Sequence, residues 1–88
     1  MQEKDLEKIF KAFANRRRLA ILKFLKKNKE QSVGEVADAI KLSFKSTSKH
    51  LLILSNAEII EADQVSLVKF YSLFSKPNSL VKEIIDSL

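Results

Sequence analysis

Residues 32–56 read SVGEVADAIKLSFKSTSKHLLILSN and contain the signals for two short helices joined by a tight turn. Ser32 and Glu35 stand three positions apart, which is the spacing of a capping box at a helix N-terminus. The apolar residues that follow recur at helical spacing and predict a helix over 33–40. They are Val33, Val36, Ala37 and Ile40.

The second helix of this pair has a polar and basic outer side. Leu42 falls in the turn, Ser43 is placed to cap the next helix, and that helix is expected to run to about Asn56. Its inward residues are Thr47, Leu51 and Leu54, and its small polar or basic residues are Lys45, Ser46, Ser48, Lys49 and His50. A helix pair of this kind is typical of a helix-turn-helix, whose second helix enters the major groove of DNA.

Two further helices are predicted before this pair. The first has apolar residues at helical spacing: Leu6, Ile9, Phe10 and Phe13. Asn15 can cap the second, which is expected to end near Asn28, a residue type that tolerates the left-handed conformation. Its apolar side consists of Leu19, Ile21, Leu22 and Leu25.

The period changes after the helix pair. A short strand is expected at Ile59, Ile60 and Ala62, a turn at Asp63, Gln64 and Ser66, and a second strand over Leu67–Phe74. In the second strand Val68, Phe70 and Phe74 point one way, and Lys69 and Tyr71 the other. Pro77 is expected just inside a last helix, whose apolar residues are Leu80, Val81, Ile84, Ile85 and Leu88.

These elements predict one domain over residues 1–88 of mainly α class with a small β-hairpin. The architecture is a winged helix-turn-helix with about five helices and a two-stranded wing. The first and last helices are more apolar than one face of so small a domain can bury. We therefore expect terminal dimerisation helices formed by Leu6, Ile9, Phe10, Phe13, Leu80, Val81, Ile84, Ile85 and Leu88.

The positive charge is concentrated in two segments. Residues 8–29 contain nine bases and no acid, and residues 41–57 contain three bases and no acid, in a chain of formal net charge +5. Solvated helix faces would produce such runs, but so would a surface that binds a polyanion. Charge alone does not separate DNA, RNA and an anionic membrane.

The composition excludes several classes of function. The chain lacks cysteine, which rules out disulfides, thiol catalysis and thiolate metal sites, and its one histidine is His50. Neither a Gly-rich phosphate loop nor a catalytic constellation is present, so we expect no enzyme activity and no cofactor. An apolar run of membrane-spanning length is also missing, and the N-terminus is charged, so we expect a cytoplasmic protein.

Over residues 9–74 the sequence resembles the ArsR/SmtB family of winged-helix repressors. The resemblance rests on four segments: 10–22, in which an Arg-Leu pair precedes Ile-Leu; 32–37; 43–54; and the aromatic pair at 70–71. It implies a homodimeric DNA-binding regulator, a repressor, whose recognition helix spans about 43–56. In that family the terminal helices build the dimer.

The sequence departs from that family at the metal-binding residues and at positions that are often Gly. Many members of that family hold metal through Cys near the third helix or through Asp/His and His/Glu pairs on the last helix, and this chain has neither. Metal sensing is therefore not expected. Lys41, Glu58 and Ser66 replace residues that are often Gly in the family, which predicts backbone strain at Lys41 and Glu58. Asp63 and Gln64 near the wing tip predict a small contribution of the wing to DNA affinity.

The candidate DNA-binding residues lie on the helix pair over 32–56 and at the start of the helix that follows Asn15. They are Lys41, Ser43, Phe44, Lys45, Ser46, Ser48, Lys49, His50, Arg16 and Arg17. The lysines are expected on phosphates and Ser46 on a base edge. Phe44 either contacts a thymine methyl or covers the turn, and Arg18 is interpreted as a structural ion-pair partner. His50 is interpreted as structural or phosphate-facing.

Two functions fit these features. The first is a homodimeric transcriptional regulator that binds double-stranded DNA, with its effector unknown. The second is a winged-helix protein interaction module without sequence-specific DNA binding. An interaction module has no use for two acid-free basic segments, which favours the first.

Overall fold

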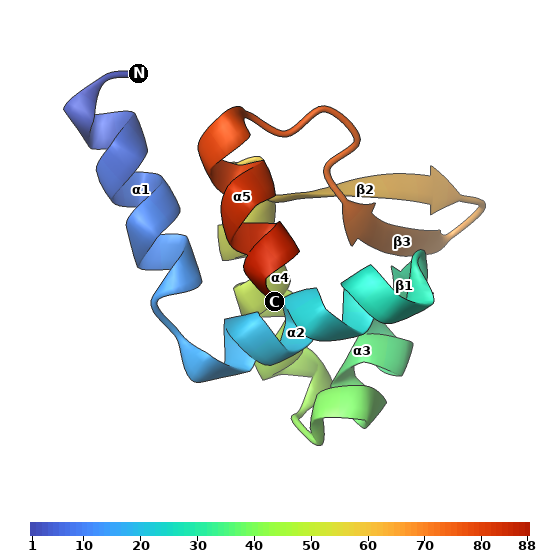
Figure 1. Cartoon of the computed structure of the whole chain (residues 1–88). Helices are drawn as coiled ribbons and strands as arrows, with labels where there is room; N and C mark the ends of the chain where they lie inside the picture. Colours follow the sequence, from blue (N-terminus) through green and yellow to red (C-terminus); the bar gives the residue numbers. More distant parts are fainter.

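The computed structural model describes all 88 residues and contains five helices and a small sheet. The sheet lies at one side of the helices, on the side away from α1 (Figure 1). In chain order the elements are α1 (Glu3–Phe13), α2 (Arg16–Asn28), β1 (Gln31–Ser32), α3 (Val33–Ile40), α4 (Phe44–Asn56), β2 (Ile60–Val65), β3 (Val68–Leu73) and α5 (Ser79–Ser87). The predicted winged helix-turn-helix is confirmed.

The helix pair begins where the capping signals predict. Ser32 Oγ accepts from the Glu35 backbone N–H, and the Glu35 carboxylate accepts from the Ser32 N–H, which completes the capping box of α3. Ser43 Oγ accepts from the Ser46 N–H at the start of α4. Asn15 likewise caps α2. These caps satisfy donors that have no partner within the first turn of a helix.

The wing has one strand more than predicted. β1 pairs antiparallel with β3, so the sheet order is β1-β3-β2. β1 consists of two residues, too few to show a period-two pattern. β2 extends to Val65, so Asp63 and Gln64 lie in the strand, and the turn is confined to Ser66 and Leu67. Ile59 precedes β2 and accepts from the Phe74 N–H.

α2 ends at Asn28, as predicted, whereas the start of the last helix was predicted too early in the chain. The left-handed residue after α2 is Lys29, with φ 60°, and Asn28 is still helical. Pro77 lies before α5, because Asn78 is the N-cap and accepts from the Val81 N–H.

Backbone strain is present at all three positions at which the related family often has Gly. Lys41, Glu58 and Ser66 have φ values of 56°, 55° and 59°. A Cβ in the left-handed region costs about 1 kcal/mol relative to glycine. Lys41 ends α3 in this conformation and thereby sets the sharp turn into α4.

One core holds the five helices together. A cluster of 14 buried apolar residues draws on every helix, including Phe13, Leu22, Val36, Leu54 and Val81. Leu51 and Leu54 have no exposed surface, so one side of α4 is fixed against the core. The opposite side must therefore face solvent.

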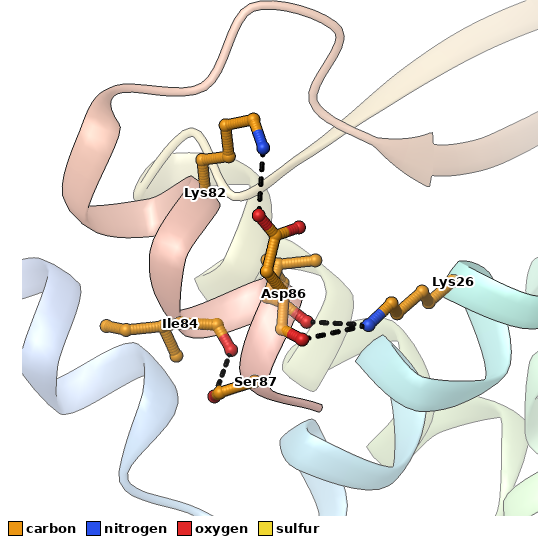
Figure 2. A network of polar contacts seen from close by, with 6 residues as sticks. Lys26, Lys82, Ile84, Asp86 and Ser87 are labelled. Atoms are coloured by element: carbon orange, nitrogen blue, oxygen red, sulfur yellow. Dashed lines mark hydrogen bonds and ion pairs between the residues drawn. The ribbon is translucent and has the colours of Figure 1, made fainter.

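The C-terminus is tied to α2 by a lysine. Lys26 Nζ donates to the backbone carbonyls of Ile85 and Asp86 at the end of α5, at 3.1 and 3.3 Å (Figure 2). A cation suits this position, because the last carbonyls of a helix carry partial negative charge. On the same helix Lys82 pairs with Asp86 at 2.8 Å (Figure 2). None of the helices is long and apolar enough to cross a membrane.

Thr47 is fully buried on the core side of α4, and its Oγ1 makes no hydrogen bond. We predict that Thr47→Val raises the free energy of unfolding by about 1 kcal/mol, because an unpaired hydroxyl is removed at nearly constant shape. Urea denaturation followed by circular dichroism measures this. Thr47→Ala is the control and should lower stability, since it also removes the methyl group. A less stable Thr47→Val would show that the hydroxyl has a partner.

Candidate nucleic-acid interface

The solvent side of α4 carries two lysines along its midline, both near the N-terminal end of the helix. Thr47, Leu51 and Leu54 point into the core, so the opposite face presents exposed residues. We call this the outer face of α4; it consists of Lys45, Lys49, Leu52, Ile53 and Asn56. Lys45 and Lys49 are one turn apart and lie in its N-terminal half.

The predicted site residues of α4 are distributed over this face and its two flanks. Ser46 and His50 are half-buried on the flank that faces α2. Phe44 and Ser48 lie on the other flank, where they line a groove together with Lys69 and Tyr71 of β3. Phe44 is 62% exposed, so its ring is accessible on this flank. The side chain of Ser43 is occupied as the cap of α4.

The wing tip is apolar and exposed, which was not predicted from the sequence. Leu67, at the turn between β2 and β3, is 93% exposed, and the neighbouring Val65 and Val68 are 58% and 44% exposed. Gln64 and Leu67 contribute to the groove between the wing and α4. The alternation of side chains along a strand does not predict the exposure of these three residues. They lie at the tip of the hairpin, where the chain turns and both faces of the sheet are open to solvent.

Arg18 joins three helices from the first turn of α2. Its Nε donates to the Ala12 carbonyl at 2.7 Å, and its Nη2 to the Lys11 carbonyl at 3.0 Å, both near the end of α1. Its Nη1 lies 3.1 Å from His50 Nδ1 on α4. Arg18 was predicted to form an ion pair. That prediction was wrong, because the partners are backbone carbonyls and an imidazole.

His50 is held in its neutral form. Burial lowers the pKa of His50 below its usual value of 6.5, and the positive charges of Arg18 and Arg17 lower it further. Burial also lowers the pKa of Arg18. Because a guanidinium can only donate, Nδ1 is the acceptor, and the ring proton of the neutral imidazole is on Nε2.

Arg16 and Arg17 are exposed at the start of α2, beside His50. Together with Asn15 and His50 they line a hollow without any apolar lining residue, which we call the polar hollow. The structure contains two ion pairs, Lys11–Glu7 and Lys82–Asp86, and neither involves α2 or α4. The basic side chains of these two helices are therefore not neutralised within the chain.

The terminal helices are used mainly within the chain itself. Ile9, Phe13, Val81 and Ile85 belong to the buried core, which corrects their assignment to a dimer surface. The physical reason is that these four side chains are among only 14 that bury apolar surface in the core. Leu6, Leu80, Ile84 and Leu88 are half-buried, and Phe10 remains 50% exposed.

A helix-turn-helix with an exposed basic second helix and an adjoining wing defines the class of winged-helix DNA-binding domains. The family model described as "Bacterial regulatory protein, arsR family" matches residues 15–62, more than half of the chain. The protein belongs to the ArsR family.

Relatives of this chain are transcriptional regulators. It is 39% identical over 77 residues to a helix-turn-helix-type transcriptional regulator of Methanocaldococcus jannaschii, covering 88% of this chain and 83% of the relative. It is 35% identical over 80 residues to the transcriptional activator HlyU of Vibrio cholerae, covering 91% of this chain and 73% of the relative. The solved structure of HlyU superposes with a TM-score of 0.81 at 34% identity, covering 99% of this chain and 92% of that chain.

A third relative is described as a homodimer. The winged helix-turn-helix DNA-binding domain of Mb0332 from Mycobacterium bovis, a possible ArsR-family transcriptional regulator, superposes with a TM-score of 0.82. The identity is 25%, and the match covers 96% of this chain and 74% of that chain.

The lowered pKa of His50 has a consequence for stability. Its folded pKa lies below its unfolded value, so the unfolded state binds more protons between the two values. The stabilisation is fully present above about pH 6.5 and is lost as the pH falls through the folded pKa. We predict an NMR titration midpoint below 6.5 for this single histidine. Urea unfolding should show stability falling below pH 6.5, and less so in His50→Gln; a midpoint above 6.5 would contradict this.

Proposed function

We propose that this protein is a sequence-specific DNA-binding transcriptional regulator that inserts α4 into the major groove. The observation that carries the proposal is the outer face of α4, where Lys45 and Lys49 stand exposed with no acid within ion-pairing distance. Arg16 and Arg17 extend this positive surface to α2. The proposed contacts remain Lys41, Ser43, Phe44, Lys45, Ser46, Ser48, Lys49, His50, Arg16 and Arg17, with Ser43 acting through its backbone and cap.

The exposure pattern favours a division of roles different from the one suggested by sequence. The residues at the centre of an inserted helix approach the base edges, and those on its flanks approach the groove walls. Lys45 and Lys49 are central, whereas Ser46 lies on a flank. We therefore propose that Lys49 contacts a base edge and also contributes to the electrostatic attraction to DNA. Ser46 is proposed to contact the sugar-phosphate backbone of the DNA.

We predict that Lys49→Ala reduces the slope of log affinity against log salt by about 1 on any duplex. On the best site obtained by selection from random duplexes, it should cost an additional 1–3 kcal/mol, roughly the value of one base contact. Ser46→Ala should weaken binding to selected and random duplexes alike. Fluorescence anisotropy over a range of salt concentrations measures both effects.

Lys4→Ala is the matched control, because it removes the same charge from the exposed start of α1 and should change binding little. If Lys49→Ala weakens all duplexes equally and Ser46→Ala only the selected site, the roles are those inferred from the sequence. If neither variant changes affinity, α4 does not read DNA, and the interaction-module hypothesis is favoured.

We further propose a homodimer that uses the residues left uncovered on the terminal helices. Phe10 is half-exposed on α1, and Leu80, Ile84 and Leu88 are half-buried on α5. The description of Mb0332 as homodimeric supports this. A two-fold dimer would present its recognition helices to half-sites about one helical turn apart, roughly 34 Å.

We predict a sedimentation-equilibrium mass of twice the 10.1 kDa of the chain at micromolar concentration. Phe10→Glu should give a monomer, because it places a charge in the apolar contact. Phe44→Glu is the control: Phe44 is also exposed but lies on α4, so the dimer should persist. A wild-type mass of one chain would contradict the proposal.

The regulator is proposed not to sense metal and to act in the cytoplasm, in the compartment that holds its DNA. The structure contains no group of three or more His, Cys, Asp or Glu side chains placed to hold an ion. Repression is the simplest action, because a dimer bound over a promoter blocks access to it. The related HlyU is named an activator, so the sign of regulation depends on where the operator lies.

A further inference from the structure

We propose that the polar hollow binds a phosphodiester of the DNA backbone, and that Arg18 is the positioning residue that holds His50 as its neutral donor. The hollow is lined by Asn15, Arg16, Arg17 and His50. This inference rests on the proposed DNA-binding function. It adds a defined anion site beside α4 and a residue, Arg18, that acts without touching the ligand.

The chemistry of Arg18 fixes the proton of His50. The guanidinium lies 3.1 Å from His50 Nδ1 and has donors only, so Nδ1 must offer its lone pair. The same guanidinium is held by the Ala12 and Lys11 carbonyls, so the ring is oriented from α1 through α2. Nε2 then carries the N–H and has no partner within the chain. The imidazole lines the hollow, so Nε2–H is the group that it can offer to an anion.

The other groups of the hollow complete an anion site. Asn15 Oδ1 accepts the Arg17 and Arg18 backbone N–H groups, which fixes the bend between α1 and α2. The Arg16 and Arg17 guanidinium groups are exposed and have no acidic partner. None of the four lining residues is acidic. Two guanidinium groups and one neutral N–H supply donors for the oxygens of a phosphodiester, and the positive charge of the guanidinium groups attracts its negative charge.

The position of the hollow identifies the anion as backbone phosphate. His50 lies on the flank of α4, at the side of the outer face and away from the wing. When a recognition helix occupies the major groove, its flanks face the sugar-phosphate strands. The contacts of the hollow therefore contribute affinity without sequence preference.

A neutral donor and a cationic donor differ in their salt dependence. An arginine that neutralises a phosphate releases counterions, so Arg17→Gln should reduce the salt slope by about 1. His50 is neutral, so His50→Phe, which keeps a ring but removes the donor, should leave the slope unchanged. It should weaken binding about tenfold on selected and random duplexes alike, the effect of one hydrogen bond to a charged group. His50→Gln should retain most of the affinity, because its amide nitrogen can take the place of Nε2.

The first measurement uses the free protein and is independent of DNA binding. Because His50 is the only histidine, the ¹⁵N spectrum of its ring is unambiguous. Above pH 7 we expect the Nε2–H form in the wild type and a mixture of both forms in Arg18→Met. An Nδ1–H form in the wild type would overturn the positioning role, whether or not the protein binds DNA.

The second measurement is the salt titration of wild type, His50→Phe, His50→Gln and Arg17→Gln, with folding checked by circular dichroism. Wild-type binding with an unchanged His50→Phe affinity would overturn the hollow and leave the DNA-binding proposal intact. A reduced salt slope in His50→Phe would show that His50 acts as a cation and would also overturn it. A wild type that binds no duplex would overturn both proposals. If His50→Phe does not fold, loss of binding by a folded His50→Gln contradicts the hollow.

Discussion

The burial of one side of α4 is the constraint on which the rest of this structure depends. Leu51 and Leu54 lie in a core of only 14 apolar residues, which receives side chains from all five helices. Each member of so small a core matters for stability, since small domains bury a smaller fraction of their surface than large ones. Rotation of α4 would expose apolar area worth about 25 cal/mol per Å², so the orientation of its outer face is determined.

The small size of the core also explains why the terminal helices leave little apolar surface exposed to solvent. Ile9 and Phe13 of α1, and Val81 and Ile85 of α5, complete the core. Lys26 secures α5 by binding its last carbonyls, and Arg18 secures the end of α1 in the same way (Figure 2 shows the first of these). Lys26 and Arg18, two cations of the basic segment 8–29, therefore hold neighbouring helices together.

α4 begins at a strained turn and has a positively charged flank where it faces α2. Lys41 adopts a left-handed conformation that is unfavourable for a residue with a Cβ, and two residues later Ser43 caps α4. The strain is offset by the core contacts of both helices. On the flank of α4 that faces α2, burial lowers the pKa of His50 and the positive charges of Arg18 and Arg17 lower it further, so at pH 7 the positive charge lies on the arginines and lysines and not on the histidine.

Local rules predicted the helices and the caps at Asn15, Ser32 and Ser43 from the sequence, whereas the left-handed conformations at Lys41 and Glu58 were expected only from the family resemblance. The capping box of Ser32 and Glu35, the cap at Ser43 and the inward face of α4 depend on residues within a few positions, so the sequence contains them. The strand β1 and the partners of Arg18 were decided by the tertiary structure. β1 is defined only by its pairing with β3, about 40 residues away, and Arg18 meets His50 32 positions along the chain. Contacts between distant segments depend on how the helices pack around the core. A pattern of residues that are close together in the sequence does not determine that packing.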